Sequence, residues 1–247
     1  FRSREFEQME MEFFVKPDET SEWLEYWSNA RLDWYKSLGV TEKKLKLRPH
    51  KDNELAHYAA ACLDVEYKFP FGWSELEGIA DRGSYDLNQH AQHSGKKLTW
   101  FDSKTNEHIT PAVVEASAGV DRTVLTILVD AYHEEEVKGE QRVVLKLNPK
   151  VAPITVAVFP LVNRDGMPEI AEKIIDALKG DFATFFDAGG SIGRRYRRQD
   201  EAGTPYGVTV DSDTLTDQAV TVRERDSMAQ ERVTMDRLSS YVRDKLR

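Results

Sequence analysis

The sequence predicts an α+β domain built on an antiparallel sheet, followed by a small three-layer α/β domain. Residues 8–15 alternate between apolar and polar side chains, as a half-buried strand does. Candidate strands in the first part are separated by helices irregularly, whereas strand and helix alternate beyond residue 150. A polar, acidic stretch over 134–150 lies between the two patterns. We therefore expect one domain over 1–147 and a second over 148–247.

The first strand has two unlike faces. Because side chains of a strand alternate, one face is apolar and suits a core, and the other combines an aromatic ring with carboxylates. The apolar face carries Met9, Met11, Phe13 and Val15, and the other carries Phe6, Gln8, Glu10 and Glu12. Carboxylates on a strand surface suggest that a cation is expected there. Arg2 and Arg4 precede this strand, and an arginine beside a flat ring suits a nucleotide.

The next elements of the first domain follow from spacing. A helix is predicted from about Thr20 to Gly39, because tryptophans and leucines recur at helical intervals, and we interpret this stripe as core. We also predict strands over 45–49, 69–87, 97–102 and 111–118, and a helix over 53–63. Gly119 opens a long helix whose apolar face is expected to carry Val120, Val124, Ile127, Leu128 and Ala131.

The second domain is expected to run β-α-β-α-β-β-α. Its first strand is apolar enough to be buried on both faces. Proline near the start and glycine at the end mark the helices. The predicted elements cover 154–162, 167–180, 183–186, 191–202, 206–210, 218–222 and 234–246.

Composition narrows the function classes. The net charge of −9 argues against a nonspecific nucleic-acid coat. From spacing alone the densest basic run, Arg194 to Arg198, is interpreted as a solvated helix face, and a structural role that packs its own domain together stays open. No apolar run is long enough to span a bilayer, so we expect no membrane partner. We expect no DNA partner either. A single cysteine, Cys62, excludes an internal disulfide and favours a reducing cytoplasm. The spacings of His50 with His57 and of His90 with His93 could bind a metal in principle, but no third ligand converges in the sequence, so we expect no metal site there.

Three segments of the first domain share inward-facing acids. They are residues 6–10, residues 75–82 and residues 115–122. Glu115 and Ser117 lie two apart on a strand, so they point the same way. Asp121 suits the first turn of a helix, but Arg122 does not, which indicates another role for this arginine.

These segments resemble a known family. R-x-x-x-F from Arg2 to Phe6 resembles the closing half of motif 2 of class II aminoacyl-tRNA synthetases, and FRSREFEQMEMEFF is similar to the homodimeric glycyl type. EASAGVDR at 115–122 resembles motif 3, although Ala116 stands where that family usually has proline. GWSELEGIADRGSYDL resembles the segment between these motifs, and residues 191–211 are similar to the anticodon-binding domain of the glycyl, prolyl, threonyl and histidyl enzymes.

The resemblance implies roles residue by residue. Arg2 would lie near the γ-phosphate of ATP, Phe6 and Arg122 would enclose adenine, and Glu75 would help hold Mg²⁺. Arg2, Glu75 and Arg122 are the expected catalytic residues. The wider ATP site would comprise Phe1, Arg2, Ser3, Arg4, Glu5, Phe6, Glu75, Leu76, Gly119, Val120, Asp121 and Arg122. The glycine site would comprise Phe6, Glu7, Gln8, Met9, Glu10, Arg82, Glu115, Ala116, Ser117, Ala118 and Gly119.

Glu10, Glu115 and Ser117 would grip the glycine ammonium, and Arg82 its carboxylate. Because Glu75 and Arg82 face opposite sides of a straight strand, a bend near Gly78 is assumed. The resemblance thus implies a class II synthetase catalytic core, in part, followed by an anticodon-binding domain. It implies ATP-dependent ligation of glycine to its tRNA through a glycyl adenylate, in a cytoplasmic homodimer.

The chain begins at Phe1, inside a strand, so we expect it to be a piece of a longer protein. Motif 1 and the first half of motif 2 are not found in these 247 residues, which by themselves are expected to be nearly inert in ligation. Three alternatives stay open: a noncatalytic synthetase-like accessory protein, a sibling ligase for proline, threonine or histidine, and an anticodon-type RNA-binding module. Phe6, Glu75 and Arg122 argue against the accessory protein, and Glu10 with Glu115 and Ser117 favours glycine.

Overall fold

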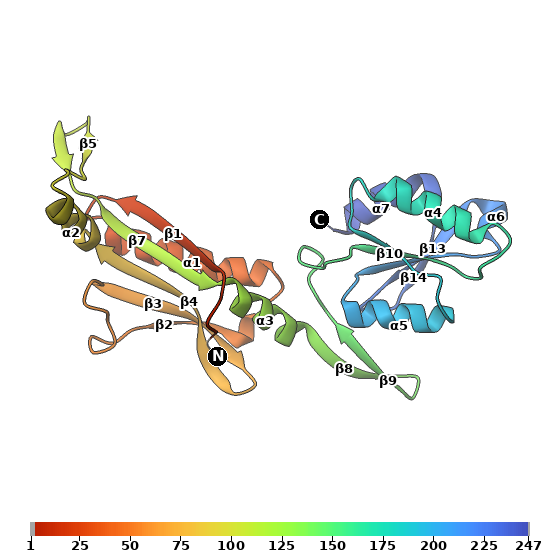
Figure 1. Cartoon of the computed structure of the whole chain (residues 1–247). Helices are drawn as coiled ribbons and strands as arrows, with labels where there is room; N and C mark the ends of the chain where they lie inside the picture. Colours follow the sequence, from red (N-terminus) through yellow and green to blue (C-terminus); the bar gives the residue numbers. More distant parts are fainter. Residues whose placement is uncertain (1–2, 247) are drawn as a thin grey trace. The chain divides into compact units, whose positions relative to one another are not determined.

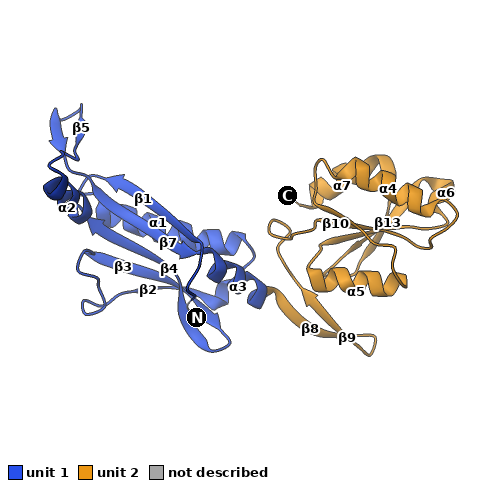
Figure 2. Cartoon of the chain, viewed as in Figure 1, with its two compact units in different colours: residues 1–130 blue, residues 131–247 orange. Residues whose placement is uncertain are grey.

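A computed structural model describes residues 3–246 of the chain, so the predictions for Phe1 and Arg2 lie outside the described residues. The chain divides into two compact units, residues 1–130 and 131–247 (Figure 2). This division falls earlier than the expected boundary between residues 147 and 148. The intervening residues form a hairpin of β8 (Tyr132–Val137) and β9 (Glu140–Leu145). Arg142 of this hairpin donates to Asp200 and to the carbonyl of Arg225, which fixes the hairpin to the second unit.

The first unit is built on a five-stranded sheet in the order β1-β7-β4-β3-β2 (Figure 1). Every neighbouring pair in it is antiparallel, as predicted. Strand β7 lies between β1 and β4, so segments far apart in sequence become neighbours. The strands are β1 (Gln8–Val15), β2 (Leu45–Pro49), β3 (Ala61–Phe69), β4 (Gly72–Gly83) and β7 (Ala112–Gly119).

Helix α1 (Thr20–Ser37) covers one face of this sheet. Trp23, Trp27 and Trp34 pack against the buried cluster that includes Tyr35, Val65 and Ile79, which confirms that the tryptophan stripe is core. Apolar surface that these rings remove from water stabilises the layer by roughly 25 cal/mol per Å².

The remaining elements of the first unit lie at its edges. They are η1 (Glu42–Lys44), α2 (Tyr85–Ser94), β5 (Trp100–Asp102), β6 (Glu107–Ile109) and α3 (Val120–Ala131). The helix predicted over 53–63 is wrong, because turns lead into β3, which begins at Ala61. The apolar face expected on α3 is correct for Ile127, which packs on the core, and for Ala131, which is buried. It is wrong for Val124 and Leu128, which are exposed, and Val129 packs on the core without having been predicted.

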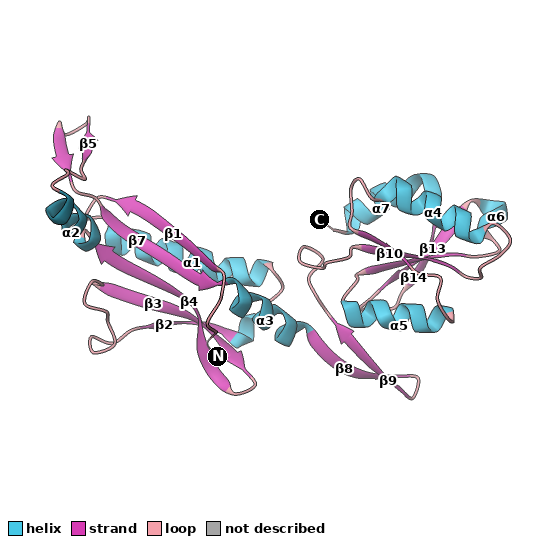
Figure 3. Cartoon of the chain, viewed as in Figure 1, coloured by secondary structure: helices cyan, strands magenta, loops and turns pink. Residues whose placement is uncertain are grey.

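The second unit has three layers, as predicted (Figures 1 and 3). Its sheet runs in the order β11-β10-β12-β13-β14, with α4 and α7 on one face and α5 on the other. Strand β14 was not predicted. The strands are β10 (Val156–Pro160), β11 (Thr184–Phe186), β12 (Tyr206–Val210), β13 (Ala219–Glu224) and β14 (Gln230–Thr234). The helices are α4 (Met167–Leu178), α5 (Ile192–Ala202), α6 (Thr214–Asp217), η2 (Met235–Arg237) and α7 (Leu238–Lys245).

Among residues 3–246, no helix combines the length and the apolar character that crossing a bilayer requires.

Candidate functional site

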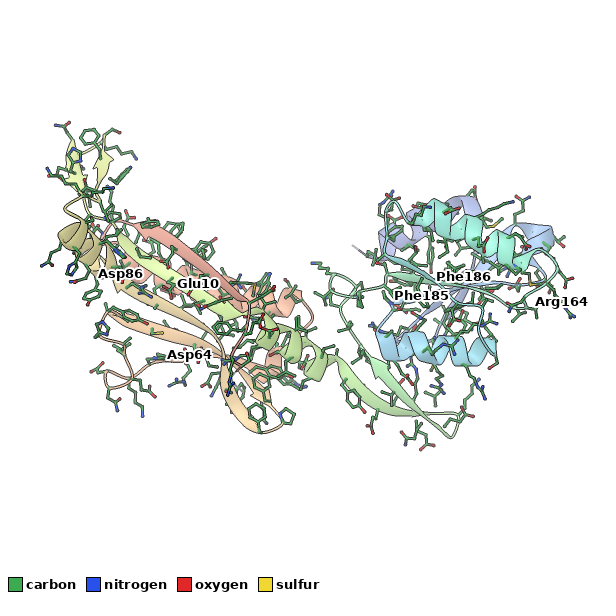
Figure 4. All side chains as sticks on the ribbon, viewed as in Figure 1. Glu10, Asp64, Asp86, Arg164, Phe185 and Phe186 are labelled. Carbon is green, nitrogen blue, oxygen red and sulfur yellow. The ribbon has the colours of Figure 1, made fainter. Side chains whose placement is uncertain are left out.

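Strand register aligns polar residues across the face of the first sheet that lies opposite α1. One row of paired residues runs Glu10, Ser117, Gly78 and Asp64, from β1 through β7 and β4 to β3. The row continues to Arg48 of β2, which pairs with Asp64, and Figure 4 labels Glu10 and Asp64. Because partners in register face the same side of a sheet, three of the predicted acid-bearing segments meet on one surface.

Glu10 belongs to a hydrogen-bonded group with Gln8 and Ser117. The Gln8 amide donates to Glu10 Oε1 at 2.9 Å and to Ser117 Oγ at 2.7 Å. The Ser117 hydroxyl donates to Glu10 Oε1 at 3.2 Å. Glu10 itself is exposed. Its carboxylate is therefore held in one orientation on the sheet surface while keeping oxygen lone pairs for a cationic ligand.

Phe6 and Arg122 line one cavity of about 500 Å³, a size usual for small-molecule sites. The Arg122 guanidinium donates to the carbonyl of Glu75 at 2.9 Å and lies 3.9 Å from its carboxylate. Phe6 is 59% exposed, so its ring is available for stacking. Among the described residues, the cavity is lined by Ser3, Phe6, Gln8, Glu75, Leu76, Ser117, Gly119, Asp121, Arg122 and Leu125.

The first turn of α3 closes one end of this cavity. Asp121 accepts a hydrogen bond from the backbone nitrogen of Glu7 at 3.2 Å, and the nitrogen of Val120 donates to the Glu7 carbonyl at 2.9 Å. These bonds tie the start of β1 to the start of α3. As a result, the chain around Phe6 is held beside Arg122.

A β-bulge, not a bend at Gly78, brings Glu75 and Arg82 to the same face, which corrects the prediction. Val65 pairs with Glu77 and Glu66 pairs with Glu75, so Leu76 is an extra residue on β4. Glu77 consequently turns toward α1, where it is buried and accepts from Arg31 at 2.6 Å and 3.1 Å. In a regular strand Glu75 and Glu77 would share a face.

Arg82 lies in a network of its own on this face. It donates to Glu115 at 2.6 Å and to Asp86 at 2.7 Å, and its guanidinium lies 4.1 Å from the ring centre of Tyr58. The hydrogen bond from Arg82 lowers the pKa of Asp86. Glu12 lies opposite Glu115 in register, and burial together with the Glu115 charge raises the pKa of Glu12.

Several residues predicted for the site do not direct their side chains toward the polar face of the sheet. Met9, Ala116 and Ala118 alternate away from the polar face, and both alanines are buried. Leu76 packs in the core while bordering the cavity. Arg4 and Glu5 are exposed, and neither lines the cavity.

Sequence reasoning missed Leu125, Tyr58 and Asp86. Leu125 lines the cavity one helical turn after Arg122, so the three-residue spacing was a usable signal. Asp86 follows Arg82 by four residues, which was a weaker signal because a strand and a helix meet there. Nothing in the local sequence pointed to Tyr58.

The basic run of α5 is only partly a solvated face. Arg194 is exposed, but Arg195 is buried and donates to three backbone carbonyls, of Pro160, Ala188 and Gly190. Arg198 pairs with Asp187 at 2.6 Å. The interpretation as a solvated face therefore fails for Arg195, which holds together the loops of its own unit.

Comparisons with known proteins agree with this architecture. The anticodon binding domain family matches residues 155–245. A solved prolyl-tRNA synthetase from Cryptosporidium parvum, complexed with L-proline and AMP, is similar in structure, with a TM-score of 0.74 and 17% identity. The match covers 99% of this chain and 51% of that one. The fold is thus that of the class II aminoacyl-tRNA synthetases, as predicted.

Sequence similarity is more particular. A glycine–tRNA ligase of Caldanaerobacter subterraneus subsp. tengcongensis is 53% identical over 247 residues, which are the whole of this chain and 53% of that protein. A glycine–tRNA ligase of Thermobifida fusca is 50% identical over 254 residues, covering 100% of this chain and 55% of the relative. The predicted resemblance to glycyl-tRNA synthetases is confirmed. The chain spans about half the length of the curated relatives that it matches.

Proposed function

We propose that this chain is part of an enzyme that activates glycine with ATP and transfers it to a tRNA. One observation carries the proposal: Phe6 and Arg122 line the same cavity, and the hydrogen-bonded Gln8, Glu10 and Ser117 group adjoins it. A ring and a guanidinium on one cavity suit a purine between them. An oriented carboxylate at its edge suits an ammonium group.

Selection of glycine follows from exclusion. The amino acid would lie over the row that contains Gly78, with its ammonium on Glu10 and Ser117. The Arg82 guanidinium already bonds Glu115 and Asp86, so it would bind the substrate carboxylate as a shared partner. A side chain on the substrate would need space that these groups occupy, and such steric rejection discriminates well.

Nucleotide binding would use Phe6 and Arg122 for the base, with Arg2 near the γ-phosphate, as the resemblance implies, and Ser3 in the cavity lining. The Glu75 carboxylate fits a magnesium site, because it is 53% exposed, borders the cavity and offers the oxygen ligands that this cation prefers. Bound there, Mg²⁺ would neutralise phosphate charge. The chain's own part is positioning: it holds the glycine carboxylate and the nucleotide in one orientation, and no side chain need act as nucleophile.

The second unit would bind the anticodon stem-loop of a glycine tRNA, which the family match over residues 155–245 supports. We further propose a cytoplasmic homodimer for the whole protein, on the strength of its resemblance to glycyl-tRNA synthetases. The unit boundary at residue 130 leaves the β8–β9 hairpin with the RNA-binding unit.

The test is amino-acid-dependent exchange of pyrophosphate into ATP by the full-length protein. Glycine should stimulate exchange, and proline, threonine, histidine and alanine should not. Stimulation by one of those amino acids instead would identify a sibling ligase, and no stimulation by any of them would favour the accessory protein. Lys43→Ala, on an exposed residue away from the cavity, serves as the control for effects of mutation in general.

A further inference from the structure

We propose that His50, Cys62 and Asp64 form a binding site for a zinc-type transition-metal ion. One ligand atom from each residue lies within 4.8 Å of the other two. Imidazole nitrogen, thiolate sulfur and carboxylate oxygen are the ligands that zinc uses in proteins. In a tetrahedral zinc site neighbouring ligand atoms lie about 3.5 Å apart. Side-chain rotations that move the ligand atoms by about 1 Å would bring these three atoms to that separation.

The backbone fixes the three residues before any ion binds. Cys62 and Asp64 lie two apart on β3, so both face the polar side of the sheet. His50 follows the end of β2, and its backbone nitrogen donates to the carbonyl of Cys62 at 2.9 Å, which continues the β2–β3 pairing. The site therefore stands on two paired strands rather than on a loop.

The charges around Cys62 favour a cation. Burial raises the pKa of the Cys62 thiol to about 11, the negative charges of Asp64, Glu75 and Glu115 act in the same direction, and the positive charge of Arg48 opposes them. Arg48 donates to Asp64 Oδ2 at 2.9 Å, donates to Glu54 and forms an ion pair with Glu66, so it retains partners if Asp64 turns toward an ion. A divalent ion on one thiolate, one carboxylate and a neutral imidazole gives a site of zero net charge. The thiol proton would leave to solvent as the sulfur–metal bond forms.

His50 gives a second indication. Its Nε2 atom is buried and lies 2.8 Å from Asp64 Oδ2, yet it makes no well-directed hydrogen bond. A protonated His50 paired with Asp64 is the competing explanation. That ion pair does not involve a cysteine, so an effect of metal on Cys62 distinguishes a metal site from the His50–Asp64 ion pair.

The test measures protection of Cys62 from alkylation by Zn²⁺. Because the 247-residue chain has one cysteine, every labelled thiol in it is Cys62. One equivalent of Zn²⁺ should slow labelling at least tenfold, and Co²⁺ should give a thiolate-to-metal charge-transfer band. Loss of a ligand should weaken binding at least about tenfold, since changes to residues behind the ligands already cost 10–100-fold.

His50→Ala is the main variant, because its side chain is partly exposed and its loss should leave the fold intact, which circular dichroism checks. Asp64→Asn is the second variant, and Cys62→Ser should abolish the cobalt band. His93→Ala, on exposed α2, is the matched control and should bind like the wild type. Unslowed labelling in the wild type, or equal protection in His50→Ala, would overturn the proposal. Neither result bears on glycine activation, which the exchange assay reads separately.

Discussion

The arginines of the two units differ in what they contact, and the difference separates structural from ligand-binding cations. In the second unit, Arg142, Arg195 and Arg225 are buried and bond backbone carbonyls of their own unit. In the first unit, Arg122 is partly exposed and borders a cavity beside an exposed phenylalanine. A basic run in sequence is therefore weak evidence of a nucleic-acid surface, because burial decides the role.

The largest effect is expected from Arg142→Ala. Its side chain is fully buried and donates to Asp200, which is also buried, so truncation removes one of the two arginines, Arg142 and Arg223, that pair with Asp200 among the described residues. Breaking a buried pair costs about 3–5 kcal/mol of unfolding free energy, which urea denaturation measures. Arg194→Ala, on an exposed residue of α5, should change it by less than about 0.5 kcal/mol. Equal stability of the two variants would contradict the distinction drawn above.

Arg122→Ala should act on catalysis instead. Loss of a positioned charge at the nucleotide typically lowers kcat/KM about 10²–10³-fold, and we expect this for ATP in pyrophosphate exchange. Arg122→Lys should recover little, since a lysine ammonium cannot stack as a planar guanidinium does. An unchanged KM and kcat in Arg122→Ala would remove this residue from the site.

Glu10→Gln should affect glycine more than ATP. Hydrogen bonds to charged groups contribute about 1.5–3 kcal/mol, so the KM for glycine should rise roughly tenfold or more. The KM for ATP should change little, because Glu10 does not line the cavity that holds Phe6 and Arg122. Glu25→Gln, on an exposed position of α1, provides the same chemical change elsewhere. Matching constants in the two variants would argue against an ammonium contact.

The smallest effect is expected from Glu12→Gln, measured as the dependence of Tm on pH. Burial and the Glu115 charge raise the pKa of Glu12 in the folded state, so the folded protein binds its proton more tightly than the unfolded chain. The ionised form is thus destabilising above that pKa, and the penalty disappears as pH falls below the unfolded value. The variant should have a slightly higher Tm at pH 7 and the same Tm as the wild type near pH 3.5. A lower Tm at pH 7 would show that the Glu12 carboxylate stabilises the fold.

The sequence predicted those parts whose evidence is local. The alternation over residues 8–15 predicted both faces of β1, and the tryptophan spacing predicted α1 and its core face. The helix prediction over residues 53–63 failed because apolar residues recur there at three- and four-residue intervals, as in a helix. These residues lead into strand β3, in which Val65, Tyr67 and Phe69 show the two-residue period of a strand. Short apolar runs of this kind do not distinguish helix from strand.

Local sequence patterns could not predict that the residues of the candidate site come together. That β7 lies between β1 and β4 follows from long-range pairing, and only the family resemblance suggested that Glu10, Ser117 and Glu75 approach one another. The pairing of Glu77 with Arg31 and the burial of Arg195 likewise depend on which segments fold together. The resemblance named residues for the site, but not how they are oriented.

The extra residue at Leu76 has a consequence for how this strand can vary. Between Glu75 and Arg82, substitutions should be tolerated more readily than a change in the number of residues. Removing one residue would remove the bulge and turn Glu75 toward the face of the sheet that α1 covers. Relatives that keep both residues in use should therefore keep the interval of seven positions between them. A shorter interval would be a mark of lost nucleotide handling even where every other motif is intact.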